Sequence, residues 1–226
     1  MKLSYLTKLG ESLTTKSIGR LIIIRHGESQ CNIDGIIGGL KGCTGLSSEG
    51  KKQARKLQRR LQTTHELGDN VVIYSSDLPR AIETAKYVAR AVGSEEVFKD
   101  KALKELDPGE GDGLTWKEFL DKYGVPNFKT DPDKPVADGG ESWNQMMNRS
   151  RNALIKITNR HIDKTVVAVC HGGVIQASMA RFLELKNNGV DANLKPEYTS
   201  ITEWRGRNRI FKLVRYNDFE HLLTKS

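Results

Sequence analysis

The chain has 226 residues, with 36 Lys and Arg against 28 Asp and Glu, which gives a formal net charge of +8. This length suits one domain with a substantial core. A mean hydropathy of −0.52, without an apolar run near the ~20 residues of a membrane span, argues against a membrane protein. The three cysteines are few and odd in number, which is typical of a reducing compartment, and we expect a cytoplasmic protein.

The first 19 residues precede any strand signal and are interpreted as an N-terminal extension. Leucines at positions 3, 6, 9 and 13 alternate with lysines and predict a short amphipathic helix. The segment lacks the continuous apolar core of a secretory signal.

The first strand signal is the apolar run 21–24, which is followed by Arg25-His26-Gly27-Glu28. Four successive aliphatic residues predict a buried strand, and Gly27 permits a sharp turn after it. Ligands bind at this carboxyl edge of open α/β sheets. A single histidine here is more often structural. The alternative is that His26 is a neutral imidazole nucleophile in a cationic pocket, suited to attack on phosphorus.

A basic amphipathic helix is predicted over residues 47–61, capped near Ser47. Much of the positive charge lies on its outer face, at Lys51, Lys52, Arg55, Lys56, Arg59 and Arg60. A solvated helix face explains this pattern, and basic and aromatic residues are not interleaved as in single-strand binders. We therefore expect no nucleic-acid partner, and we interpret the positive charge as attracting anionic substrates.

Residues 71–85 predict a strand, a turn and a helix, with Pro79 in the first helical turn. Arg80 then lies at the same sheet edge as His26. The simpler interpretation is a surface arginine near Glu83. A position just after a strand, as for His26, favours a phosphate-binding arginine instead.

The segment 103–113 contains four carboxylates between glycines, namely Glu105, Asp107, Glu110 and Asp112. They either solvate a loop or include a general acid. Four of the six prolines of the chain fall between 100 and 140, around one helix with a predicted capping box, Thr115 and Glu118. We interpret residues 105–140 as a cap insertion that selects the substrate.

A second strand-to-histidine junction occurs after the apolar run 166–169, at His171-Gly172-Gly173. The backbone N–H groups of the helix that begins there favour an anion. The preceding helix starts after Ser142, and we expect its inner residues, including Trp143 and Met147, to belong to the core. Strands at 200–204 and 210–214, with a turn at 205–209, predict an antiparallel pair.

Taken in order, these motifs closely resemble the histidine phosphatase superfamily, which includes cofactor-dependent phosphoglycerate mutases and many small-molecule phosphatases. The resemblance covers roughly residues 20–216, with 217–226 as a C-terminal tail. The motifs that carry it are Arg25-His26-Gly27-Glu28-Ser29 with Asn32, Leu46-Ser47 with Gly50, Ser75 to Ala81, Leu103-Lys104-Glu105 and His171-Gly172.

The resemblance implies a phosphoglycerate mutase-like, three-layer α/β/α sandwich with a mostly parallel central sheet, a late antiparallel pair and a small cap. It also implies a covalent phosphohistidine on His26. Among the four carboxylates, the family pattern favours Glu105 as the general acid, with Asp107 and Glu110 as alternatives. The implied phosphate pocket consists of Arg25, Asn32, Arg80, His171 and Gly172.

The expected reaction is metal-independent hydrolysis of a small, anionic phosphorylated metabolite, without a cofactor. Only five histidines are present, two are assigned to the site, and Cys-x-x-Cys pairs are lacking, so we expect no metal site. The alternative function is a cofactor-dependent phosphoglycerate mutase. The sequence departs from the mutase pattern at Cys31, at 103–107, and in lacking paired cap arginines. A third hypothesis is an inactive phosphate-binding scaffold. The oligomeric state stays open, with a homodimer as one option.

Overall fold

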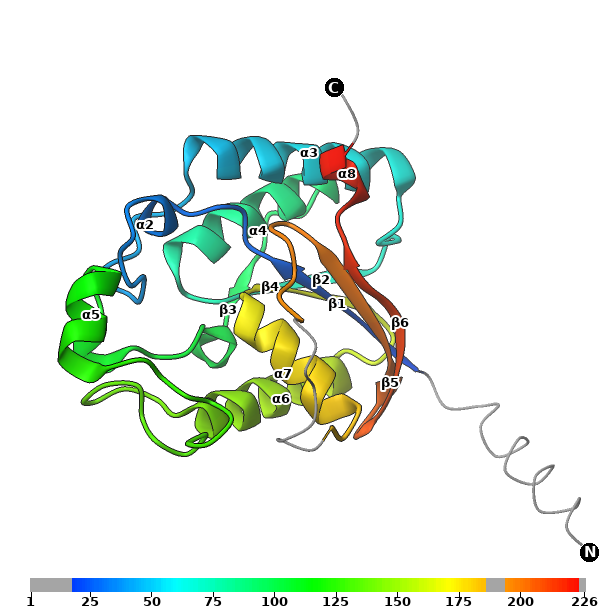
Figure 1. The fold of residues 1–226 in the computed structure, drawn as a ribbon. Coiled ribbons are helices and arrows are strands. Elements are labelled where there is room, and N and C mark those ends of the chain that lie inside the picture. Colours follow the sequence, from blue (N-terminus) through cyan, green and yellow to red (C-terminus); the bar gives the residue numbers. More distant parts are fainter. Residues whose placement is uncertain (1–17, 186–193, 224–226) are drawn as a thin grey trace, which may run out of the picture.

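The computed structural model describes residues 18–185 and 194–223, so the helix expected within the first 17 residues lies outside the described part. Within that part, six strands form one sheet in the order β3-β2-β4-β1-β5-β6 (Figure 1). The parallel strands are β1 (Gly19–Arg25), β2 (Val71–Ser75), β3 (Phe98–Lys99) and β4 (Thr165–Cys170). The antiparallel strands are β5 (Ile201–Arg207) and β6 (Ile210–Asp218).

Helices cover both faces of this sheet, as expected for a three-layer α/β/α sandwich (Figure 1). On one face, α3 (Ser48–Thr64) and α4 (Pro79–Ala91) bury Leu57 and Val88 against Ile22 and Ile24. On the other face, α6 (Trp143–Arg160) and α7 (Gly172–Phe182) pack on Leu21, Ile23 and Trp204. Because β1 is covered on both faces, its residues 21–24 are all aliphatic and fully buried.

The helix starts follow the predicted capping chemistry. The Ser47 hydroxyl accepts a hydrogen bond from the Gly50 N–H and begins α3, and Pro79 occupies the first turn of α4. The cap helix α5 (Trp116–Tyr123) has the expected capping box of Thr115 and Glu118. The short α2 (Gln30–Ile33) and α8 (Glu220–Leu223) complete the helices of the described chain.

The C-terminal hairpin differs from the expected one in the length of its turn. Strands β5 and β6 extend to Arg207 and Ile210, leaving Asn208 and Arg209 as the turn, with Asn208 in the left-handed region at φ 58°. Gly206 is part of the strand, and a Cβ there would collide with the Ile210 carbonyl oxygen. The glycine that indicated a turn therefore serves close strand packing.

The cap has its own small core, separate from the two main ones. Phe119 of α5 packs with Ile37 and Ala137, and the Ile37 N–H donates to the Leu114 carbonyl at 2.8 Å. The segment after α2 therefore fixes the cap over the carboxyl ends of the parallel strands.

Candidate active site

His26 lies immediately after β1, and its tautomer follows from its two partners. The Gly27 carbonyl oxygen, 2.6 Å from Nδ1, can only accept, so Nδ1 carries the proton. The Arg80 Nε–H donates to Nε2 at 3.1 Å, which leaves the Nε2 lone pair facing the arginine. Burial, then the charges of Arg80 and Arg25, hold the pKa of His26 well below its usual 6.5.

Gly27 is required for packing. A Cβ there would lie 2.7 Å from the Gly50 carbonyl oxygen, so a larger residue would push the turn after β1 away from α3. The Gly27 N–H also donates to the Thr84 hydroxyl of α4 at 3.1 Å. These contacts fix the loop that carries His26.

Arg25 and Arg80 are both buried beside His26. Arg80 donates from Nη1 to the Gly38 carbonyl at 2.7 Å. Arg25 donates from Nη1 to the Pro196 carbonyl at 2.5 Å, and its guanidinium carbon lies 4.0 Å from the ring centroid of Tyr198. The Arg25 Nε is buried without a partner in the described chain, and burial lowers the pKa of this arginine. A buried guanidinium with an unused donor is suited to hold an anion.

His171, at the start of α7, is fully buried, and its ring centroid lies 5.0 Å from that of His26. Its Nε2 lies 2.8 Å from the Ser76 hydroxyl, which also accepts the Leu78 N–H at 3.2 Å. The Ser76 hydroxyl keeps its own proton and can donate it to Nε2, in which case the histidine proton is on Nδ1. That Nδ1 is buried without a partner among the described residues. Burial, followed by Arg80, keeps the pKa of His171 well below 6.5.

Glu105 is the carboxylate that reaches the pocket of His26. Its Oε2 accepts the Gly173 N–H at 3.0 Å, and its Oε1 accepts the Leu106 N–H at 3.0 Å. The other three carboxylates have different partners, which are Lys104 for Asp107, Lys122 for Glu110, and the N–H groups of Gly39, Lys41 and Gly42 for Asp112. Of the four carboxylates, Glu105 is therefore the one that lines the pocket of His26.

Two further expected residues lie at the site. Asn32 lines the pocket, and its Oδ1 accepts the Ser29 hydroxyl, so its amide NH₂ can donate to a ligand. Gly172 lies beside Arg25 and Glu105, since a Cβ there would be 3.9 Å from Nε and 4.0 Å from Oε2, respectively. The pocket lining itself includes Gly173.

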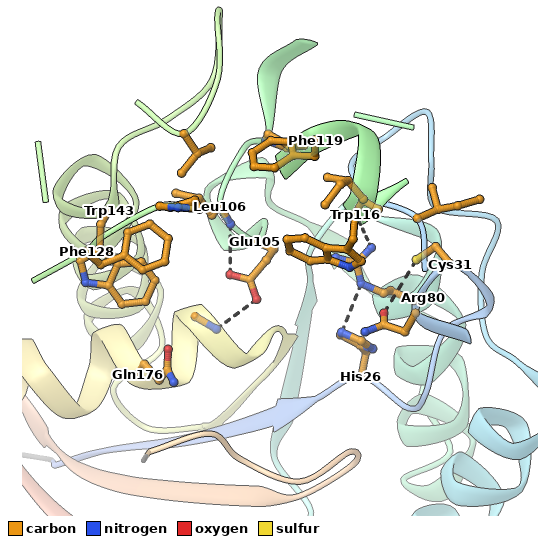
Figure 2. Close-up of a pocket in the computed structure, with 18 of the residues that line it drawn as sticks. His26, Cys31, Arg80, Glu105, Leu106, Trp116, Phe119, Phe128, Trp143 and Gln176 are labelled. Carbon is orange, nitrogen blue, oxygen red and sulfur yellow. Dashed lines mark hydrogen bonds between the residues drawn. The ribbon is translucent and has the colours of Figure 1, made fainter. Parts of the chain in front are cut away.

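One pocket of about 340 Å³, whose outer part is formed by the cap, is lined by Arg25, His26, Asn32, Arg80 and Glu105 (Figure 2). His171 and Gly172 are not part of this lining. Met147 is buried as expected. Trp143 is partly buried against the cluster of Met147, as expected, but it also lines this pocket. Helical periodicity placed Trp143 inward, but it is the first residue of α6 and faces the cap. Ser76 belongs to the motif Ser75 to Ala81, but the sequence analysis gave it no role at the site. Sequence reasoning also missed Gln176, Pro196 and Tyr198, for which the sequence offers no motif signal.

Cys31 and Cys43 form a pair of thiols near Arg80. Both are buried and reduced, and Cys31 lines the pocket. A hydrogen bond from the Cys31 thiol, with the charge of Arg80, lowers the pKa of Cys43 to about 5, while the pKa of Cys31 is raised. Cys170 is fully buried in the core, which raises the pKa of its thiol.

The described residues lack two further kinds of feature. No group of three or more His, Cys, Asp or Glu side chains is placed to hold a metal ion there. In the same residues, helices with the length and apolarity needed to cross a bilayer are lacking.

Comparison with known proteins agrees with this geometry. The model of the histidine phosphatase superfamily (branch 1) matches residues 21–219, and the chain belongs to this superfamily. A metal-independent phosphoserine phosphatase of Arabidopsis thaliana is 32% identical over 219 residues, covering 95% of this chain and 88% of the relative. Phosphoserine phosphatase 1 of Hydrogenobacter thermophilus is 34% identical, covering 86% and 91%, respectively.

A solved mycobacterial glucosyl-3-phosphoglycerate phosphatase superposes with a TM-score of 0.73 at 27% identity, covering 88% of this chain and 99% of the other. The fold, the family match and these relatives identify the chain as a phosphoric monoester hydrolase of the histidine phosphatase type.

Proposed function

We propose that the enzyme hydrolyses small phosphomonoesters through a phosphohistidine on His26, without a metal or cofactor. The observation that carries this proposal is the fixed tautomer of His26, with its Nε2 lone pair directed toward Arg80. A buried imidazole with a lowered pKa stays neutral and nucleophilic at neutral pH. The relatives that are phosphoserine phosphatases support hydrolysis as the outcome.

In the first step, Nε2 of His26 attacks phosphorus in line and the P–O ester bond breaks. Glu105, in its protonated form, transfers its proton to the departing oxygen and releases an alcohol. Arg25, Arg80 and the Nδ1–H of His171 donate to the equatorial oxygens. Arg80 must then direct donors to the phosphoryl group instead of to Nε2, which frees the lone pair for attack.

In the second step, water attacks the phosphohistidine and gives a proton to Glu105. The N–P bond breaks, inorganic phosphate leaves, and both His26 and Glu105 return to their starting states. The buried guanidiniums supply the positive charge that a metal provides in other phosphatases. We place the reaction in the cytoplasm, in agreement with the three free thiols.

A mutase would retain the phosphoenzyme and return the phosphoryl group to a bound product that carries a second anionic group. Among the described residues that line the pocket, Arg25 and Arg80 are the cations. One dianionic phosphate already balances the charges of Arg25 and Arg80, which leaves no cation of this lining for a second anionic group. Hydrolysis is therefore favoured over transfer to a bound product.

The test of this function combines labelling and product analysis. Acid-labile, base-stable phosphate should label the wild type and disappear in the His26→Ala variant, with hydrolysis lost and the circular dichroism spectrum unchanged. Chelator should leave the wild-type rate unchanged, and 3-phosphoglycerate with catalytic bisphosphoglycerate should give little 2-phosphoglycerate. Labelling at another residue would refute the assignment of His26, and fast isomerisation without phosphate release would make the enzyme a mutase.

A further inference from the structure

The outer part of the active-site pocket is aromatic. Trp116 begins α5, Phe128 lies in the loop after it, and Trp143 begins α6, so three separate segments each place a ring on this cavity. The rings of Phe128 and Trp143 stack, with centroids 4.7 Å apart and planes at 22°. Trp116 is 53% exposed and Phe128 is 36% exposed. Large exposed aromatic side chains that converge on one cavity are typical of a ligand site.

Among the described residues that line this outer part of the pocket, no cation is placed to pair with a carboxylate of the substrate. Arg25 and Arg80 lie at the His26 end, and Glu105 is the third charged group of the lining. Two basic residues near the Glu105 loop are already paired, Lys104 with Asp107 and Arg149 with Glu141. A substrate carboxylate between the aromatic rings would lose water without gaining a charged partner.

Gln176 of α7 is the uncharged polar side chain on this side of the pocket. Its amide both donates and accepts hydrogen bonds, so it can bind one neutral hydroxyl or carbonyl group. Figure 2 shows Trp116 on one side of the cavity, Phe128 and Trp143 on the other, and Glu105 directed into the space between them. An ester oxygen next to Glu105 would therefore carry its organic group into the aromatic region.

We propose that the preferred substrates are phosphomonoesters of neutral, apolar alcohols that carry a ring, bound between Trp116 and the stacked pair of Phe128 and Trp143. This inference rests on the proposed phosphatase function and adds the chemical class of the alcohol. Burial of the ring supplies binding free energy, and offset or edge contacts with the aromatic side chains orient it.

Four esters of primary alcohols test the class while keeping the leaving oxygen similar. They are ethyl phosphate, 2-phenylethyl phosphate, 2-(4-carboxyphenyl)ethyl phosphate and phosphoserine. We expect kcat/KM for 2-phenylethyl phosphate to exceed that for ethyl phosphate by roughly 10- to 100-fold, mainly through KM. The added carboxylate should remove most of this gain, and phosphoserine should rank below 2-phenylethyl phosphate.

Substitutions in the full chain test whether the aromatic side chains cause the preference for 2-phenylethyl phosphate. Trp116→Ala and Phe128→Ala should raise KM for 2-phenylethyl phosphate by roughly 3- to 10-fold and raise KM for ethyl phosphate much less, with Trp116→Phe restoring most of the loss. Leu120→Ala is the matched control, because Leu120 is on the same helix, is 38% exposed, and does not line the pocket.

A preference for phosphoserine or the carboxylated ester, or equal effects of Trp116→Ala on ethyl and phenylethyl esters, would overturn the substrate class. If that preference occurs together with hydrolysis that depends on His26, the proposed phosphatase function stands and only the substrate class fails. If the enzyme hydrolysed none of the four esters, both the proposed phosphatase function and the proposed substrate class would be refuted.

Discussion

The Nε of Arg80 donates a hydrogen bond to Nε2 of His26 over 3.1 Å, so the proposed phosphate-binding arginine occupies the lone pair of the proposed nucleophile. The second donor group of this arginine is fixed on the Gly38 carbonyl at 2.7 Å. The side chain is therefore held beside His26 before a substrate enters, and its Nε–H must turn from Nε2 to the phosphoryl group for attack to occur.

Replacing Arg80 tests this arrangement. Arg80→Lys keeps the charge but cannot donate through Nε and a planar fork together. We expect phosphoenzyme formation to slow by roughly 10²- to 10³-fold, the usual cost of one lost oxyanion donor, as measured by burst kinetics. Arg90→Lys is the control, because Arg90 is an exposed residue in the last turn of the same helix. Equal effects of the two substitutions would contradict a role for Arg80 at phosphorus.

The buried histidines should make stability depend on pH. Burial lowers the pKa of His26 and His171 well below 6.5, and the pKa of His221 falls to about 4 for the same reason. The unfolded chain therefore takes up protons first as the pH drops below about 6.5. The free energy of unfolding should fall from there downward, by up to about 1.4 kcal/mol per pH unit for each histidine.

Urea unfolding between about pH 7.5 and 5 measures this slope, above the range in which carboxylates titrate. The His171→Gln variant should show a smaller dependence of the free energy of unfolding on pH.

In a complementary measurement, nitrogen NMR of the wild type at about pH 6 should find His26 neutral with its proton on Nδ1. A His26 protonated at both nitrogens would refute the assigned state.

Glu105 is tested through the leaving group. Alkyl esters expel a strongly basic alkoxide and need a proton, whereas p-nitrophenolate leaves with little help. Glu105→Gln should slow phosphorylation by an alkyl phosphate by roughly 10²- to 10⁴-fold, and phosphorylation by p-nitrophenyl phosphate far less. Asp107→Asn is the matched control on the same loop. A selective loss in Asp107→Asn or Glu110→Gln, with Glu105→Gln affecting both esters equally, would move the general acid to another carboxylate.

We expect Arg149 of α6 to be a positioning residue for Glu105. Its guanidinium donates to the backbone carbonyls of Ala102, Lys104 and Glu105 at 3.0, 3.1 and 3.3 Å, and it pairs with Glu141 at 2.6 Å. We expect Arg149→Lys to lower kcat for alkyl phosphates more than for p-nitrophenyl phosphate, because the misplaced group is the acid. Arg151→Lys on the same helix should be neutral. A uniform loss for both esters would indicate a purely structural role.

Cys43 should be the reactive thiol of the chain. A pKa of about 5 makes it a thiolate at neutral pH, and thiolates are the nucleophilic form. Iodoacetamide at about pH 6.5, followed by mass spectrometry, should modify Cys43 before Cys31 and Cys170. Inorganic phosphate should slow the reaction, since Arg80 faces both the thiol and the anion. Equal labelling of all three cysteines would indicate that local unfolding controls access.

Much of the fold was predictable because its signals are local. The aliphatic runs at 21–24 and 166–169 and the capping residues Ser47 and Ser142 each determine an element through its own neighbours. Parallel pairing of β1 and β4 aligns Arg25 with Cys170, so the residues that follow, His26 and His171, meet at one edge. The resemblance to the histidine phosphatases supplied the roles of these residues.

The hairpin turn and the place of Trp143 could not be predicted in the same way. Gly206 carries the same local signal for a turn as for a tightly packed strand, and only the pairing with Phe211 decides between them. Trp143 satisfies the period of α6, but its position at the first turn exposes it to the cap, which is folded from a different part of the chain.

The sequence by itself determined which strands end in His26 and His171 and which helix begins beside Arg80, because backbone preferences and burial act over a few residues. The family pattern had already favoured Glu105 among the four carboxylates, but only the tertiary structure decided which of them lines the pocket of His26 and which segment encloses Arg25. The Pro196 carbonyl that binds Arg25 lies 171 residues away in the chain. Contacts of that range depend on how the cap and the loop before β5 pack onto the sheet, and no local pattern encodes them.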